Sequence, residues 1–100
     1  MKGFFTKFAT NPEDRDALVA LLEQAARGMQ GIEDCKLYVV SKDATDIAVT
    51  WVSEVWTDHE THRAALQVPD AKALIAKAMP LLTAGPEQTA LDIVGGKGIE

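Results

Sequence analysis

The side chains best able to exchange protons gather between positions 53 and 63 of the sequence. This stretch holds the carboxylate of Glu54, the imidazoles of His59 and His62, and the large aromatic ring of Trp56. Imidazoles titrate close to neutral pH, so such a set could perform acid–base chemistry on a bound molecule. Each residue also has an ordinary explanation: a solvated carboxylate, a hydrogen-bonded histidine, or an aromatic ring that plugs the edge of the core.

The other chemistry-bearing residues indicate no second kind of site. His59 and His62 are three positions apart, whereas zinc-protease helices space their ligands by four, and no third ligand is obvious. We therefore expect no metal. Cys35 is the only cysteine, which excludes an internal disulfide and a multi-thiolate metal site. The glycine-rich run 95–98 lacks the hydroxyl residue and the helix that follow a phosphate loop, and we expect a tail there.

The first third of the chain predicts a strand followed by a helix. Residues 2–9 are aromatic-rich, and their alternation places Phe4 and Phe8 on one face and Phe5 on the other. Asn11 then caps a predicted helix that has a proline at its first position. Apolar residues recur at helical spacing after it, and glycines end it: Leu18, Leu21, Leu22, Ala25 and Met29, then Gly28 and Gly31.

The remaining strands are predicted from β-branched and aromatic runs. Residues 35–41 and 47–56 form a hairpin around a polar turn at 42–46. Residues 87–94 have the pattern of a last strand before the glycine-rich tail.

Two short helices are predicted between the hairpin and the last strand. Thr57 and Glu60 have the spacing of a capping box, which would start a helix that runs to about Leu66. Pro69 starts the next helix, and Pro80 limits it. The buried side of this second helix would consist of Leu74, Ile75, Ala78 and Met79.

The resulting order, β-α-β-β-α-α-β, is that of a ferredoxin-like α+β sandwich with a four-stranded antiparallel sheet. Right-handed crossovers place both helical connections on the same face of the sheet. The other face then has no helix to cover it, although the strands carry apolar residues on both faces. Leaving that area wet is costly at ~25 cal/mol per Å². We therefore expect a homodimer packed sheet to sheet, which is a dimeric α+β barrel.

Composition limits the class of protein. The chain has 100 residues, 47% of them hydrophobic and 25% charged, which predicts a single globular domain over residues 1–100. Its formal net charge is −5 and no basic stripe exists, so we expect neither nucleic acid nor a membrane as a partner. The N-terminus lacks the apolar core of a signal peptide, and no apolar run approaches ~18 residues. We therefore expect a cytoplasmic protein.

Around the proton-exchanging stretch, the sequence resembles the antibiotic-biosynthesis-monooxygenase-type family. The resemblance is carried by residues 53–63 (SEVWTDHETHR), by Pro69 and the short helix after it, by residues 80–82 (PLL) and by the glycines of 95–98. The family consists of small dimeric α+β barrel proteins and includes quinol monooxygenases that use no cofactor. The resemblance implies that O₂ oxidises a small phenolic or quinol-like substrate between sheet and helices, without flavin, haem or metal.

The resemblance also implies roles for individual residues. His62 would be the base that takes a proton from the substrate, and Glu54 would orient it or bind a substrate hydroxyl. Trp56 would form an aromatic wall. Further lining is expected from Phe4, Phe8, Leu66 and Met79. The haem-degrading branch places its axial histidine on the next helix, where this chain has residues 73–75 (ALI), so no haem is expected.

The leading hypothesis is therefore a cofactor-independent monooxygenase that acts on a small aromatic molecule and O₂. The same base and pocket could instead isomerise a small carbonyl compound by moving protons alone. A third hypothesis is a non-catalytic dimeric ligand-binding or stress-associated protein whose pocket only sequesters a hydrophobic small molecule. Consumption of O₂ separates the first hypothesis from the other two.

Overall fold

The computed structural model of the chain describes residues 1–99, and its elements follow the predicted order. The strands are β1 (Lys2–Ala9), β2 (Cys35–Lys42), β3 (Val49–Trp56) and β4 (Glu87–Asp92). The α-helices are α1 (Arg15–Gly28), α2 (His59–Leu66) and α3 (Pro69–Ala78). Short 3-10 turns precede α1 (η1, Pro12–Asp14) and follow α3 (η2, Met79–Leu81). The predicted ferredoxin-like α+β fold is confirmed.

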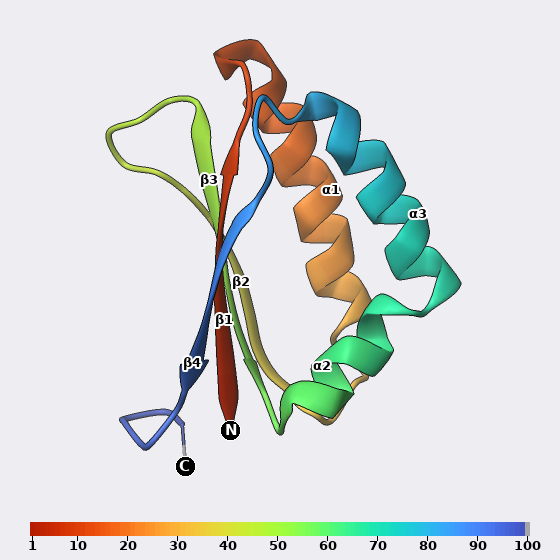
Figure 1. Cartoon of the computed structure of the whole chain (residues 1–100), viewed down its shortest axis with the longest axis vertical. Helices are drawn as coiled ribbons and strands as arrows, with labels where there is room; N and C mark the ends of the chain where they lie inside the picture. Colours follow the sequence, from red (N-terminus) through yellow and green to blue (C-terminus); the bar gives the residue numbers. More distant parts are fainter. Residues whose placement is uncertain (100) are drawn as a thin grey trace.

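The four strands form one antiparallel sheet in the order β2-β3-β1-β4. Figure 1 shows the helices on one side of this sheet, with α1 and α3 side by side along the strands and α2 near the end where the chain begins. Right-handed crossovers account for this one-sided arrangement. Within residues 1–99, no helix covers the opposite side, and none is long and apolar enough to cross a membrane.

The core between helices and sheet is built on the apolar stripe of α1. Leu18 and Leu22 are buried against Val52 of β3 and Ala78 of α3. Burial of a large aliphatic side chain contributes about 1.5–3 kcal/mol to folding, so this cluster fixes α1 and α3 over the sheet. The partly buried residues packed around it are Phe8, Leu21, Tyr38, Val40, Leu81 and Leu82.

The hairpin differs from the prediction in where its second strand begins. β3 starts at Val49, two residues later than predicted. The loop before it has hydrogen bonds of its own, because the carboxylate of Asp43 accepts from the backbone N–H groups of Thr45 and Asp46. The guanidinium of Arg15 donates to three backbone carbonyls at this end of the hairpin. These bonds compete with strand pairing and lengthen the loop.

The start of α2 also differs from the prediction. The capping box consists of Asp58 and Thr61 rather than Thr57 and Glu60. The Asp58 carboxylate accepts from the N–H of Thr61 at 2.8 Å, and the Thr61 hydroxyl accepts from the N–H of Asp58 at 3.4 Å. The Thr57 hydroxyl instead donates to the carboxylate of Asp34 at 2.9 Å. The predicted pair was therefore wrong by one position, because Thr57 has a partner outside the helix.

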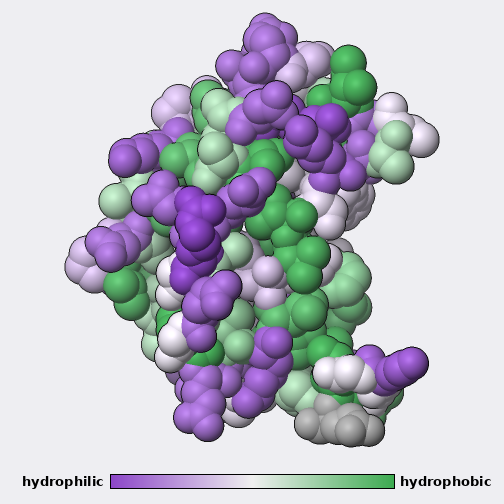
Figure 2. Space-filling view, turned by 180° about the vertical axis from the view of Figure 1, so that it is seen from behind, coloured by the Kyte–Doolittle hydropathy of each residue, from purple (hydrophilic) through white to green (hydrophobic). Residues whose placement is uncertain are grey.

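The sheet face without helices is apolar and exposed, and we call it the outer face. Its most exposed large apolar residues are Phe5 (42%), Leu37 (37%), Val39 (42%) and Leu91 (38%). The strand register places Phe5 and Val39 in one cross-strand row and Leu37 and Leu91 in the next. Figure 2 shows a band of hydrophobic side chains running down the molecule toward the C-terminal tail. A face of this kind is typical of a surface that binds a partner.

Candidate active site

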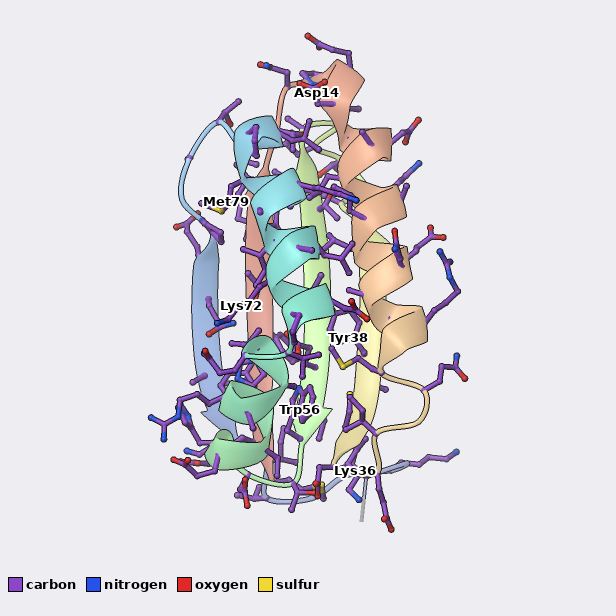
Figure 3. All side chains as sticks on the ribbon, turned by 90° about the vertical axis from the view of Figure 1, so that its right-hand side faces the viewer. Asp14, Lys36, Tyr38, Trp56, Lys72 and Met79 are labelled. Atoms are coloured by element: carbon purple, nitrogen blue, oxygen red, sulfur yellow. The ribbon has the colours of Figure 1, made fainter. Side chains whose placement is uncertain are left out.

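Three side chains form a row across the helix-covered face of the sheet. The strand register aligns Tyr38 of β2, Glu54 of β3 and Phe4 of β1. Directly paired residues share a face, and neighbouring strands lie about 4.8 Å apart. Trp56 is two residues beyond Glu54 on the same strand and therefore has the same orientation. Figure 3 shows Tyr38 and Trp56 projecting from neighbouring strands toward the helices.

The short helix α2 places His62 on top of this row. The imidazole stacks on the ring of Phe4, with centroids 3.8 Å apart and an interplanar angle of 18°. The edge of Trp56 meets it at 5.5 Å and 68°. Its Nε2 atom lies 3.7 Å from Oε1 of Glu54. His62 is only 5% exposed, so its ring is enclosed with Phe4 against one face, Trp56 at a steep angle to it, and Nε2 toward the carboxyl group.

Glu54 is a buried carboxyl group, 7% exposed, with one oxygen committed and one free. Its Oε1 atom accepts a hydrogen bond from Nε1 of Trp56 at 3.0 Å. The same oxygen is the one that faces His62. Among residues 1–99, no group hydrogen-bonds to Oε2, so this oxygen can interact with a bound molecule.

Burial shifts the pKa values of this pair in opposite directions. It raises the pKa of Glu54 above its usual value of 4.5, although the hydrogen bond from Trp56 acts against the shift. It lowers the pKa of His62 below 6.5, and the charge of His59 adds to that effect. The two pKa values therefore shift toward each other, which reduces the cost of moving a proton from the carboxyl group to the imidazole.

A cavity of about 720 Å³ lies over the row, between the sheet and the helices. Sites for small molecules typically measure about 300–1,000 Å³. Tyr38, Glu54 and His62 contribute polar groups to its lining. The apolar lining from the helices includes Leu21, Leu22, Ala25, Met29, Leu74 and Ala78. The cavity thus combines a small number of titratable groups with mostly apolar walls, which is the usual make-up of a ligand site.

The structure brings most of the predicted site residues together. Glu54, Trp56 and His62 are in mutual contact, and all three line the cavity. The other predicted residues that line it are Phe8, Leu66 and Met79. Leu66 and Met79 are exposed (39% and 51%), so the prediction of Met79 on the buried side of its helix was wrong. Phe4 does not belong to the lining, because His62 covers its ring. Its place is beneath the base rather than beside a ligand.

Tyr38 lines the cavity next to Glu54 and was not predicted as a site residue. The available signal is the hairpin register, which the longer loop alters. With β3 starting at Val49, Tyr38 pairs with Glu54.

Residues 1–99 contain no cluster of three or more His, Cys, Asp or Glu side chains suited to a metal ion.

Comparison with known families and structures places this geometry in context. The sequence profile of a family described as antibiotic biosynthesis monooxygenase matches residues 4–77. A protein of Chloroflexus aurantiacus, provisionally named an antibiotic biosynthesis monooxygenase, is 36% identical to this chain. The match covers 99% of this chain and 98% of that one, with a TM-score of 0.85. Among curated proteins, no match to this chain was found.

Two more distant structures share the fold. A Deinococcus radiodurans protein with the same provisional name is 22% identical over 100% of this chain and 99% of its own, with a TM-score of 0.86. Rv0793 from Mycobacterium tuberculosis is 21% identical over 96% and 97%, with a TM-score of 0.86. At these identities the likeness concerns the fold alone.

Proposed function

The chain belongs to the antibiotic biosynthesis monooxygenase family, and on that basis we propose that it oxidises a small phenolic or quinol-type substrate with O₂ and without a cofactor. The observation that carries the proposal is the pairing of His62 with Glu54 inside a largely apolar cavity. Oxidation of a phenol by O₂ starts with loss of its proton, because the anion gives up an electron far more readily. A buried imidazole that is neutral near physiological pH is suited to that step.

In the proposed reaction the substrate supplies all the electrons. One hydroquinone and one O₂ give one hydroxyquinone and one water. His62 takes a phenolic proton, the anion passes one electron to O₂, and the radical and superoxide combine into a peroxide at a ring carbon. The protonated His62 returns its proton to that peroxide. The ring carbon then loses its hydrogen as a proton while the O–O bond breaks, which leaves a carbonyl group and releases water.

Glu54 is proposed to support the base. Its oxygen 3.7 Å from Nε2 favours the protonated form of His62 when the carboxyl group is ionised, and this attraction is strong in apolar surroundings. The hydrogen bond from Trp56 holds the carboxyl group in place. The stacked ring of Phe4 fixes the plane of the imidazole. The base is therefore positioned before the substrate arrives, which reduces the cost of reorganisation.

The apolar walls are proposed to keep water from the intermediates. A radical and superoxide must recombine before either escapes, and a dry, enclosed site favours that outcome. Trp56 is 1% exposed and forms one wall of the cavity. Phe8 lines the cavity from β1, and Leu66 and Met79 line it where it approaches the surface.

The protein is proposed to act as a homodimer whose two sheets pack through their outer faces. Four large apolar side chains of this face are more than a third exposed, in adjacent rows of one sheet. A second copy presents the same apolar face, so a two-fold axis that lies between the two sheets would cover both faces at once. Sedimentation velocity at micromolar concentration tests the proposal. The expected species is the dimer, and a stable monomer would contradict it.

The activity is tested by measuring O₂ uptake with a panel of hydroquinones and isotopically labelled O₂. We expect one labelled oxygen in the product and a loss of about 100-fold or more in the rate of His62→Ala. Arg63→Ala is the control, because Arg63 is an exposed residue of the same helix whose side chain pairs only with Glu60. Equal rates for wild type and His62→Ala would remove His62 from the mechanism.

Failure of the activity itself has two distinguishable forms. Conversion of a carbonyl substrate without O₂ uptake would identify an isomerase. A ligand that raises the melting temperature and is recovered unchanged would identify a binding protein.

A further inference from the structure

Tyr38 occupies a place next to the reactive pair that the proposed reaction does not use. It is paired directly with Glu54 across β2 and β3, on the face that lines the cavity. On the other side of Glu54, Phe4 carries the stacked ring of His62. The carboxyl group of Glu54 therefore lies between the tyrosine and the histidine. A flat molecule placed over Glu54 would reach both neighbours.

The hydroxyl group of Tyr38 has no hydrogen-bond partner among residues 1–99, whereas the ring packs against the core cluster around Leu22 and Val52. Tyr38 is partly buried, and its hydroxyl is not one of the fully enclosed oxygens that lack a partner, so it stays accessible from the cavity that the residue lines. The hydroxyl oxygens of Thr10 and Thr50 also lack a partner, but these residues are 3% and 0% exposed and neither lines the cavity. Among the described hydroxyl groups without any partner, only that of Tyr38 belongs to a residue that lines the cavity.

The chemistry of Tyr38 is that of a neutral donor. Burial raises the pKa of its phenol, and the nearby carboxyl group of Glu54 raises it further. The hydroxyl therefore keeps its proton at physiological pH and can donate it to an acceptor oxygen. His62, with its lowered pKa, serves as the acceptor of protons in the same cavity. The two groups complement each other, because Tyr38 can donate a hydrogen bond to one substrate oxygen while His62 takes the proton from another.

We propose that Tyr38 is a substrate-binding residue that donates a hydrogen bond to a second oxygen of the substrate, while His62 addresses the first. This inference rests on the proposed function and names the feature that selects its substrates. A molecule with two oxygens on opposite sides of a ring system satisfies both groups, whereas one with a single phenolic hydroxyl leaves Tyr38 without a partner. An unsatisfied polar group in an apolar site weakens binding of the wrong ligand.

The experiment compares two probes that O₂ does not oxidise. One is 6-hydroxy-1-tetralone, which carries a phenol and a carbonyl oxygen. The other is 5,6,7,8-tetrahydro-2-naphthol, which has the same skeleton and phenol without the carbonyl. Calorimetric titration gives the ratio of the two dissociation constants for wild type and for Tyr38→Phe. We expect the substitution to change this ratio by about 2- to 10-fold in favour of the probe without the carbonyl, which is the effect of one hydrogen bond.

Thr50→Val is the matched control, because it removes one unpartnered hydroxyl away from the cavity. It should leave the ratio unchanged. If Tyr38 had a purely structural role, Tyr38→Phe would lower the affinity for both probes equally. An unchanged ratio of the two dissociation constants in this variant therefore overturns the proposal. Failure of wild type to bind either probe overturns it as well. If Tyr38→Phe does not fold, the infrared carbonyl band of the ketone bound to wild type decides, since a band at its position in dry alkane contradicts a hydrogen bond.

The result is independent of oxygen chemistry. A changed ratio in a protein that consumes no O₂ with any quinol would retain Tyr38 as a ligand-binding residue and remove the monooxygenase. An unchanged ratio in a protein that does consume O₂ would remove the role of Tyr38 alone.

Discussion

The two faces of the sheet are made by alternate residues of the same strands, and they differ in what they expose. On the helix-covered face, β3 presents Glu54 and Trp56 to a cavity and keeps both nearly inaccessible. On the outer face, the adjoining strands present Phe5 and Val39 to water. The covered side thus encloses titratable groups among its apolar residues, whereas the uncovered side leaves large apolar groups exposed. This is the reverse of what a solvated monomeric sheet requires.

The difference shows that each face has its own requirement. A carboxyl group next to an imidazole is costly to bury. The presence of this pair inside the molecule is therefore best explained by a role in acid–base chemistry. Large apolar side chains are costly to expose to water. Their presence on the outer face is therefore best explained by a partner that covers them. One strand serves both requirements because successive side chains point to opposite faces.

The largest expected effect concerns the outer face. Val39→Asp would place a charge within the proposed dimer contact, and burying an unpaired charge there should weaken dimerisation by at least about 100-fold. Light scattering coupled to gel filtration measures the mass. Ala20→Asp adds the same charge to an exposed position of α1 and should leave the mass unchanged. Equal masses for both variants would show that this face makes no contact between copies.

The support of the helix-covered face is tested by Leu18→Ala. Leu18 is 0% exposed and packs in the cluster that holds α1 and α3 over the sheet. Truncation of such a side chain should lower the free energy of unfolding by about 2–5 kcal/mol. Urea unfolding followed by circular dichroism gives the value. A loss below 1 kcal/mol, on the scale of a surface substitution, would contradict the assigned core.

A smaller effect is expected at the start of the helix that carries His62. Asp58→Ala removes the side chain that accepts from the N–H of Thr61 and should cost about 1 kcal/mol. Asp70→Ala is the control, because Asp70 lies in the first turn of α3 and makes no cap hydrogen bond. Thermal unfolding of the two variants should therefore separate them. Equal melting temperatures would show that the capping box does not stabilise α2.

The pH dependence of stability tests the buried carboxyl group itself. Folding raises the pKa of Glu54. The contribution of this group to the free energy of unfolding is therefore fully present below pH 4.5 and is lost as the pH rises through the folded-state pKa. Glu54→Gln has no proton to lose. Its melting temperature, relative to wild type, should therefore increase between pH 4.5 and the folded-state pKa of Glu54 and stay level above that pKa. The opposite trend would mean that ionised Glu54 is stabilised by a charged His62.

The course of the chain was largely predictable, because each element leaves a local signal. The apolar stripe of α1, the proline at the start of α3 and the alternation of β1 each depend on a few neighbouring residues. The exact cap of α2 was not predictable, because Thr57 is diverted to Asp34, which is 23 positions away. Sequence spacing alone cannot distinguish that contact from a cap.

The site was predictable in its centre and not at its edge. Glu54, Trp56 and His62 lie within nine positions of one another, so a local pattern could reveal them. Tyr38 joins them only through the hairpin register, which depends on the loop bonds of Asp43 and on the distant Arg15. A shift of register changes which residue lies opposite Glu54, and no local pattern reports it.

The central claim is that His62 takes a proton from a phenol bound in the cavity. The most direct measurement is the absorption spectrum of bound 4-nitrophenol, which O₂ leaves unchanged and whose anion absorbs visible light. At slightly acidic pH, binding to wild type should increase the anion band, and binding to His62→Ala should not. Spectra that are the same for both proteins, with the probe shown to be bound, would contradict the claim.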